Sequence, residues 1–176
     1  MKADQVFLRT EITRQDALSM TEWLMKPHIT QYLNEGQHVV DTINQVVDRV
    51  HMPILTHLFN RNGCFFMICL GEREPIGFLR IERHQHHAEI VVVVGKEDKW
   101  GRGFGTHAIQ KGLAHVFFTW RMEKVIAKIH DCNLRSIHAF QRAGFVLEKQ
   151  ISSMGCYAIT QQAYLKHLMA AAQKIG

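Results

Sequence analysis

The chain has 176 residues, 47% of them hydrophobic, which is enough for one domain with a substantial core. Its net charge is +5, but basic residues are spread along the chain without the dense basic face that nucleic-acid binding requires, so no nucleic-acid partner is expected. The longest apolar runs, 64–70 and 90–94, are too short to cross a bilayer, and the first ten residues lack a signal-type stretch. We therefore expect a cytoplasmic protein that does not bind membranes.

The first half of the chain is expected to hold a strand, two helical stretches and three consecutive strands. Residues 5–11 alternate as a strand does, and apolar residues at helical spacing predict a helix from Asp16 to Leu33, interrupted at Pro27. A second helical stretch is expected from Val40 to Phe59. Strands are expected at 64–71, 76–82 and 88–95, and the nearly continuous apolar run of the last indicates burial on both faces.

The second half is expected to continue as one βαβα unit followed by strands. A long amphipathic helix is predicted at 108–120, then a strand at 124–130. Asn133 is a good N-cap for a short helix at 134–143, which Gly144 ends. The last two strands are expected at 145–151 and 161–169. The pattern is that of an α/β chain with two helices, antiparallel strands and one βαβα unit.

The stretch KWGRGFGTHA (99–108) has glycines at alternate positions, with an arginine between the first two. Backbone N–H groups in such a turn, at a helix N-terminus, bind anions, and the missing side chains leave room for a pyrophosphate. No P-loop sequence occurs. Residues 103–108 match the GxGxxA dinucleotide fingerprint, but six residues separate the strand from the first glycine, and too little chain follows Asp131. A plain tight turn is the structural alternative, although one glycine would suffice for it.

The stretch WGRGFG (100–105) resembles the pyrophosphate signature Q/R-x-x-G-x-G/A of the GCN5-related N-acetyltransferase (GNAT) superfamily. Trp100 replaces the usual Gln or Arg, as in the branch with ribosomal-protein N-terminal and spermidine-type acetyltransferases. NLRSIHAFQRAGF (133–145) resembles the later motif N-x-x-S/A-x-x-x-Y-x-x-x-G-F, with Phe140 at the Tyr position. The resemblance is strong over about 75–145 and weaker over the N-terminal helices. It implies a single α/β (α+β) domain over 1–176, with a central mixed, mostly antiparallel sheet flanked by helices.

The resemblance also implies acetyl-CoA as cosubstrate and direct transfer of its acetyl group to a primary amine in a ternary complex. Val93, Val94 and Gly95 match the strand whose backbone pairs with the pantetheine arm, and a backbone N–H near Val93 or Val94 is expected to meet the oxyanion. Asn133 matches a contact to the arm, although it also caps its helix. The residues that match the pyrophosphate loop are Gly101, Arg102, Gly103, Phe104, Gly105 and Thr106.

Acetyl transfer requires a neutral amine, and neutralising an alkyl amine with pKa near 10.4 costs roughly 4.6 kcal/mol at pH 7. The expected base is Glu89, because its AEI string resembles that of the catalytic glutamate in the histone acetyltransferase branch. An exposed structural role is the alternative for this residue. Another family position for a glutamate holds Lys128, which cannot act as a base while charged. The usual Tyr acid is absent at Phe140, and the candidates that could replace it are His138, Cys132, Tyr157 or water.

No metal site is expected. The four cysteines lack zinc-type spacing, and His84, His86 and His87 fit a solvated hairpin turn. For the acceptor, a protein or peptide α-amine is favoured over a small amine such as a polyamine, amino sugar or antibiotic. A polyamine would require more acidic residues than those scattered in the N-terminal helices, Asp16, Glu22, Glu35, Asp41 and Asp48. An acyl-CoA-binding regulatory module without turnover is the rival of another class, because Phe140 and Lys128 depart from the family.

Overall fold

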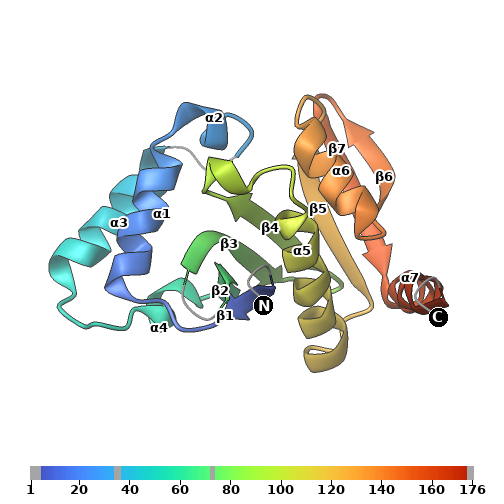
Figure 1. Cartoon of the computed structure of the whole chain (residues 1–176), viewed down its shortest axis with the longest axis horizontal. Coiled ribbons are helices and arrows are strands. Elements are labelled where there is room, and N and C mark those ends of the chain that lie inside the picture. Colours follow the sequence, from blue (N-terminus) through green and yellow to red (C-terminus); the bar gives the residue numbers. More distant parts are fainter. Residues whose placement is uncertain (1–4, 34–36, 72–73, 174–176) are drawn as a thin grey trace.

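Consecutive antiparallel pairs build the first part of the sheet in the computed structural model, which describes residues 5–33, 37–71 and 74–173 (Figure 1). The strands are β1 (Val6–Arg9), β2 (Gly63–Leu70), β3 (Glu74–Arg83) and β4 (Ala88–Val94). β2 is buried on both faces, because Phe66 and Ile68 join one core while Phe65 and Met67 join the other. This double burial explains the unbroken apolar run of β2.

The sheet continues through β5 (Lys124–His130), β7 (Met154–Thr160) and β6 (Val146–Ile151), which pair antiparallel. The strand order is β1-β2-β3-β4-β5-β7-β6. β4 and β5 are parallel and pair only at Ala88 with Val125 and Glu89 with Ile126. The two strands are therefore no longer paired toward their carboxyl ends. The expected α/β fold with a mixed, mostly antiparallel sheet is confirmed.

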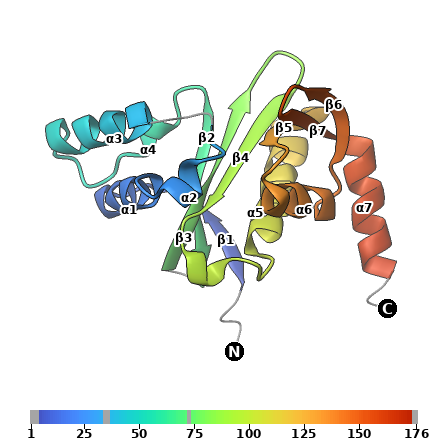
Figure 2. The same ribbon diagram turned by 90° about the horizontal axis from the view of Figure 1, so that it is seen from above.

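Helices cover both faces of the sheet, and each face has its own apolar core (Figure 2). The helices of the first face are α1 (Arg14–Leu24), α2 (Pro27–Thr30), α3 (Gln37–Arg49) and α4 (Thr56–Phe59). Those of the other face are α5 (Phe104–Ala114), α6 (Leu134–Arg142) and α7 (Gln161–Gln173). Within the described ranges, no helix combines the length and apolarity that a bilayer span requires.

The strand expected at 161–169 is wrong, because these residues lie in α7. Ala, Leu, Lys, Gln and Met favour a helix, and Thr160 caps it by accepting a hydrogen bond from the Ala163 N–H at 3.2 Å. Tyr164 is buried with its ring 5.2 Å from that of Phe117, which fixes one helix face on the core. The last strand is β7 at 154–160, which follows a turn at Ser152 with φ of 51°.

Prolines divide the two N-terminal helical stretches more sharply than expected. Pro27 occupies the first turn of α2, where its missing N–H costs nothing. The stretch expected at 40–59 is not one helix: α3 ends at Arg49, and the segment around Pro53 runs beside the start of α1, where Leu55 N–H donates to Ile12 O at 2.7 Å. The helix expected at 108–120 begins earlier, at Phe104, and ends in a π-helical turn over His115–Thr119.

Candidate active site

A cavity of about 340 Å³ opens where β4 and β5 are no longer paired. The carboxyl end of β4, the glycine turn before α5, and α6 form its walls, and Tyr32 and Leu33 after α2 close one side. Because β5 pairs with β4 only through Ala88 and Glu89, the edge of Val92–Val94 that faces β5 is open to the cavity. An open strand edge offers N–H and C=O groups to an extended amide-containing ligand.

The glycines of the turn form a cradle for an anion. Gly101 and Gly103 have φ of 73° and 83°, and Gly103 is the N-cap of α5. A Cβ added at either residue would meet no protein atom within 4 Å, so the missing side chains leave open space. The backbone therefore requires glycine for its conformation, and the free N–H groups of the first turn of α5 lie at this opening.

The charges of the cavity suit an anionic ligand. Lys99, Arg135 and Arg142 belong to its lining, and among the lining residues that the structure describes none is an Asp or Glu. Trp100 fixes the turn, because its Nε1 donates to Val94 O at 2.7 Å and the Arg135 guanidinium carbon lies 3.5 Å from its ring centroid. A pyrophosphate fits this combination of backbone donors and cations.

The lining contains most of the residues that the sequence predicts for cosubstrate binding: Val93, Val94, Gly101, Gly103, Phe104, Gly105, Thr106 and Asn133. Gly95 and Arg102 lie outside it. The N–H of Gly95 donates to Ile76 O at 2.8 Å, and a Cβ there would overlap the Trp23 ring. Arg102 is exposed, with its guanidinium carbon 5.4 Å from the Phe104 ring centroid.

Asn133 has a structural role and a place in the cavity. Its Oδ1 accepts the Ser136 N–H at 3.2 Å, which caps α6. Phe140 also lines the cavity, and its buried ring lies edge-on to Phe145 at 5.0 Å. Of the proposed replacements for the missing tyrosine hydroxyl, His138 is in the cavity lining, whereas Tyr157 is buried in the core.

Glu89 sits where the pairing of β4 with β5 ends. It pairs across the ladder with Glu82 of β3, and Lys128 Nζ lies 2.8 Å from its Oε2. The carboxylate side chain is 18% exposed, against 51% for Lys128. The hydrogen bond to Glu89 raises the pKa of Lys128, so the lysine stays charged. Glu89 itself does not line the cavity, and it precedes the lining residue Val92 by three positions on β4.

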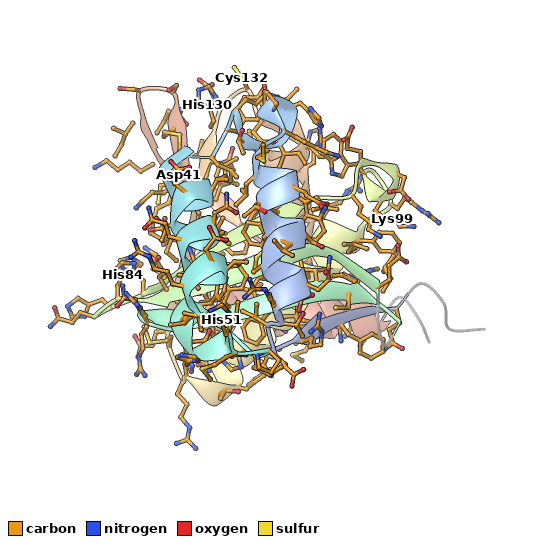
Figure 3. All side chains as sticks on the ribbon, turned by 90° about the vertical axis from the view of Figure 1, so that its left-hand side faces the viewer. Asp41, His51, His84, Lys99, His130 and Cys132 are labelled. Atoms are coloured by element: carbon orange, nitrogen blue, oxygen red, sulfur yellow. The ribbon has the colours of Figure 1, made fainter. Side chains whose placement is uncertain are left out.

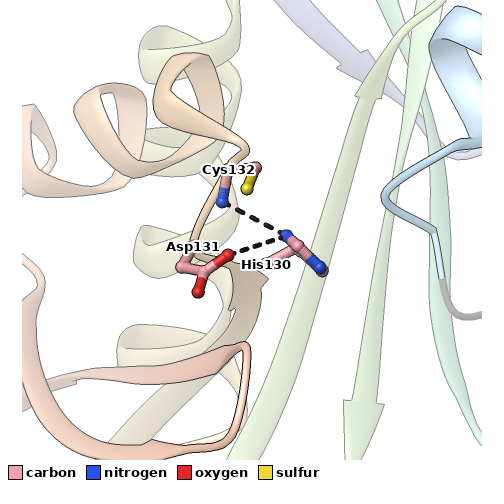
Figure 4. A group of neighbouring side chains, drawn as sticks. All are labelled: His130, Asp131 and Cys132. Atoms are coloured by element: carbon pink, nitrogen blue, oxygen red, sulfur yellow. Dashed lines mark hydrogen bonds and ion pairs between the residues drawn. The ribbon is translucent and has the colours of Figure 1, made fainter.

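Two histidine-containing clusters lie near this region. The rings of His84 and His87 stack at 4.8 Å in the hairpin turn between β3 and β4. The pKa of His87 is lowered mainly by burial and further by the neighbouring His84. At the end of β5, His130, Asp131 and Cys132 bring three potential metal-ligand atoms within 4.8 Å (Figure 4). His130 Nδ1 accepts a hydrogen bond from the Cys132 backbone N–H at 3.2 Å and lies 3.1 Å from Asp131 Oδ1, so contacts within the protein already surround this nitrogen. Glu35, one of the acidic residues considered above, lies outside the described residues.

Residues 5–146 match the family model of the acetyltransferase (GNAT) domain. The chain belongs to the GNAT acetyltransferase family. This acetyltransferase is 26% identical over 137 residues to the uncharacterized N-acetyltransferase p20 of Bacillus licheniformis, a match that covers 76% of this chain and 75% of the relative. Acetyl-CoA is its cosubstrate.

Solved structures share the fold of the acetyltransferase. A spermidine N-acetyltransferase from Vibrio cholerae, in complex with CoA and spermine, superposes with a TM-score of 0.74 at 19% identity, over 92% of this chain and 98% of that one. An aminoglycoside acetyltransferase in complex with coenzyme A gives 0.73 at 18% identity, again over 92% and 98%. At these identities the likeness concerns the fold.

Proposed function

We propose that this acetyltransferase moves the acetyl group of acetyl-CoA to the N-terminal amine of a peptide or protein, by direct attack in a ternary complex. The observation that carries the proposal is the cavity beside β4, in which cations and glycine N–H groups meet and the described lining contains no carboxylate. In this account the turn from Gly101 to Thr106 binds the pyrophosphate. The open edge of Val92–Val94 pairs with the pantetheine arm, and Asn133 contacts that arm.

The peptide acceptor is the finer part of the proposal. Of the proteins that share this fold, one was solved with spermine bound and another is named an aminoglycoside acetyltransferase. Spermine and aminoglycosides are both polycations. The four acidic residues of the described N-terminal helices lie outside the cavity lining. Asp16 is 4% exposed and pairs with Arg9 at 2.7 Å, while Glu22 on α1 and Asp41 and Asp48 on α3 are exposed. A ligand with one amine requires fewer negative charges than a polycation does.

For the chemistry, we propose that Glu89 takes the proton from the acceptor amine, directly or through a water. Once the nitrogen is neutral, it bonds to the acetyl carbon, and the bond from that carbon to sulfur breaks. The sulfur leaves as a thiolate and takes up the second proton that the nitrogen loses, directly or through a water. A backbone N–H near Val93 or Val94 stabilises the oxyanion, which is worth several kcal/mol in comparable enzymes, about 2.7–4. A thiol leaving group with a pKa near 8.5 leaves readily at neutral pH, so the base matters more than the acid.

The test is thiol release from acetyl-CoA with N-terminal peptides, polyamines, amino sugars and aminoglycosides, using wild type and Glu89→Gln. A general base contributes roughly 10²–10⁴-fold, so E89Q is expected to lose that much kcat while KM for acetyl-CoA holds. Glu148→Gln is the matched control, because Glu148 also pairs with a lysine of β5, Lys124 at 2.6 Å, away from the cavity. An unchanged rate in E89Q would overturn the base. Binding of acetyl-CoA without transfer to any amine would point to a regulatory module instead.

A further inference from the structure

Four charged side chains form a balanced patch beside the proposed base, here called the paired-charge patch: Arg80, Glu82, Glu89 and Lys128. Glu82 and Glu89 lie directly opposite each other on β3 and β4. Glu89 is level with Ile126 of β5, and the alternation of side chains puts Lys128 on the same face as Ile126. The four side chains therefore share one face of three adjacent strands.

Each carboxylate of the patch has its own cation. Arg80 Nε lies 3.4 Å from Glu82 Oε1, and Lys128 Nζ lies 2.8 Å from Glu89 Oε2. Like charges directly opposite on neighbouring strands repel, so the two cations stabilise this pair of glutamates. Without Lys128, the patch would carry excess negative charge and would attract a polycation. With Lys128 present, the patch has no excess negative charge, and the lysine repels an approaching polycation.

The patch is open to a ligand from a side away from the glycine turn. Lys128 is 51% exposed, and His84 at the hairpin end of the patch lies on the opposite side of the N-terminal helices from Lys99 (Figure 3). Lys128 is half exposed and neither Lys128 nor Glu89 lines the cavity, so an acceptor can reach this ion pair without passing the anion cradle. Its ammonium would replace Lys128 on Glu89, and an anionic group of the acceptor would replace Glu89 on Lys128. Two ion pairs between the acceptor and the protein would then replace the single ion pair between Lys128 and Glu89.

We infer that Lys128 selects acceptors that carry an anionic group a few bonds from the reacting amine, and that it rejects polycations. The inference rests on the proposed function. The shared chemistry is an amine and a carboxylate on one ligand, and it has two sources: the α-carboxylate of a free amino acid, or an acidic side chain at the start of a peptide. Attraction to Lys128 selects the ligand, and repulsion from the same residue excludes the competitor.

The experiment compares kcat/KM for matched acceptors in wild type, Lys128→Gln and Lys128→Glu. The acceptors are peptides that begin with Glu or Gln, free glutamate and its diamide, and spermidine. Wild type is expected to prefer each anionic acceptor over its neutral partner by roughly 10-fold or more, the range of a hydrogen bond to a charged group. K128Q removes this preference, and K128E raises kcat/KM for spermidine by roughly 10-fold. The peptide and amino-acid arms tell the two sources apart.

Lys124→Gln and Lys124→Glu are the matched controls. Lys124 lies on the same strand and face as Lys128, with Nζ 2.6 Å from Glu148 Oε1, but outside the patch. These variants are expected to keep the wild-type preferences. If K128E fails to fold, K128Q and its control carry the comparison. A preference that survives K128Q, or a wild type that prefers spermidine, would overturn the inference while leaving the acetyltransfer itself intact.

Equilibrium binding of spermidine separates this inference from the reaction. Calorimetry is expected to show spermidine binding at least 10-fold more tightly to K128E than to wild type, whatever the turnover. Equal affinities would overturn the role of Lys128. The absence of turnover on every acceptor, with this affinity difference present, would count against the proposed function alone.

Discussion

Replacing Gly103 by alanine separates the conformational need for glycine from its role in the anion cradle. Gly103 has φ of 83°, where an alanine costs roughly 1–2 kcal/mol, so the melting temperature should fall by about 2–8 °C in a chain of this size. The new methyl would meet no protein atom within 4 Å, so no steric clash adds to this cost. It would instead occupy the space where the pyrophosphate approaches the N–H groups. Losing one hydrogen bond to a charged group weakens binding roughly 10- to 150-fold.

The assay is calorimetric titration with acetyl-CoA, paired with thermal unfolding. Gly71→Ala is the matched control, because Gly71 has φ of 56° and open space around it but does not line the cavity. Both variants should lose similar stability, and only Gly103→Ala should lose affinity. If the two variants bind acetyl-CoA alike, the glycine turn is a structural turn and the pyrophosphate binds elsewhere.

Two further predictions concern stability. Gly95→Ala should lower the free energy of unfolding in urea by about 1–3 kcal/mol, because the new Cβ overlaps the Trp23 ring. Adding Trp23→Leu to this variant should recover part of the loss. If the double variant is no more stable than G95A, the proposed packing of Gly95 against Trp23 is contradicted. Burial raises the pKa of Asp16, but hydrogen bonds from Arg9 and Thr13 outweigh it and leave the pKa below its ordinary value. The stabilisation is therefore present above about pH 3.9 and lost as the pH falls through the folded-state pKa, so Asp16→Asn should cost about 1.5–3 kcal/mol at pH 6 and progressively less toward pH 2. A cost that does not change with pH would refute this coupling.

The strands and helices that have strong local sequence patterns could be predicted from the sequence. Continuous apolar runs identify β2 and β4, and Asn133 and Gly144 bound α6. The errors occur where tertiary contacts or helix propensity decide. The segment at 161–169 was expected as a strand although its residues favour a helix, and β7 contains a glycine, Gly155, that weakens its strand signal. The break between α3 and α4 depends on contacts with Ile12, which lies far away in sequence.

Part of the candidate site could also be predicted from local sequence patterns. Glycine spacing identifies the turn before α5, because only backbone conformation and open space are involved. Spacing says nothing of Tyr32, which closes the cavity from the segment after α2, or of the hydrogen bond from Trp100 to Val94 that fixes the turn. The pairing of Glu89 with Lys128 joins two strands 39 positions apart, which no local pattern encodes.

The measurement that tests the account most directly is backbone hydrogen exchange with and without acetyl-CoA. The amides of residues 101–106 and of the open end of β4 at Val92–Val94 should gain protection on binding, because these residues, apart from Arg102, line the cavity. The amides of β6, on the far edge of the sheet, should exchange unchanged. Tight binding that leaves 101–106 unprotected, with protection elsewhere, would contradict the assignment of this cavity to the cosubstrate.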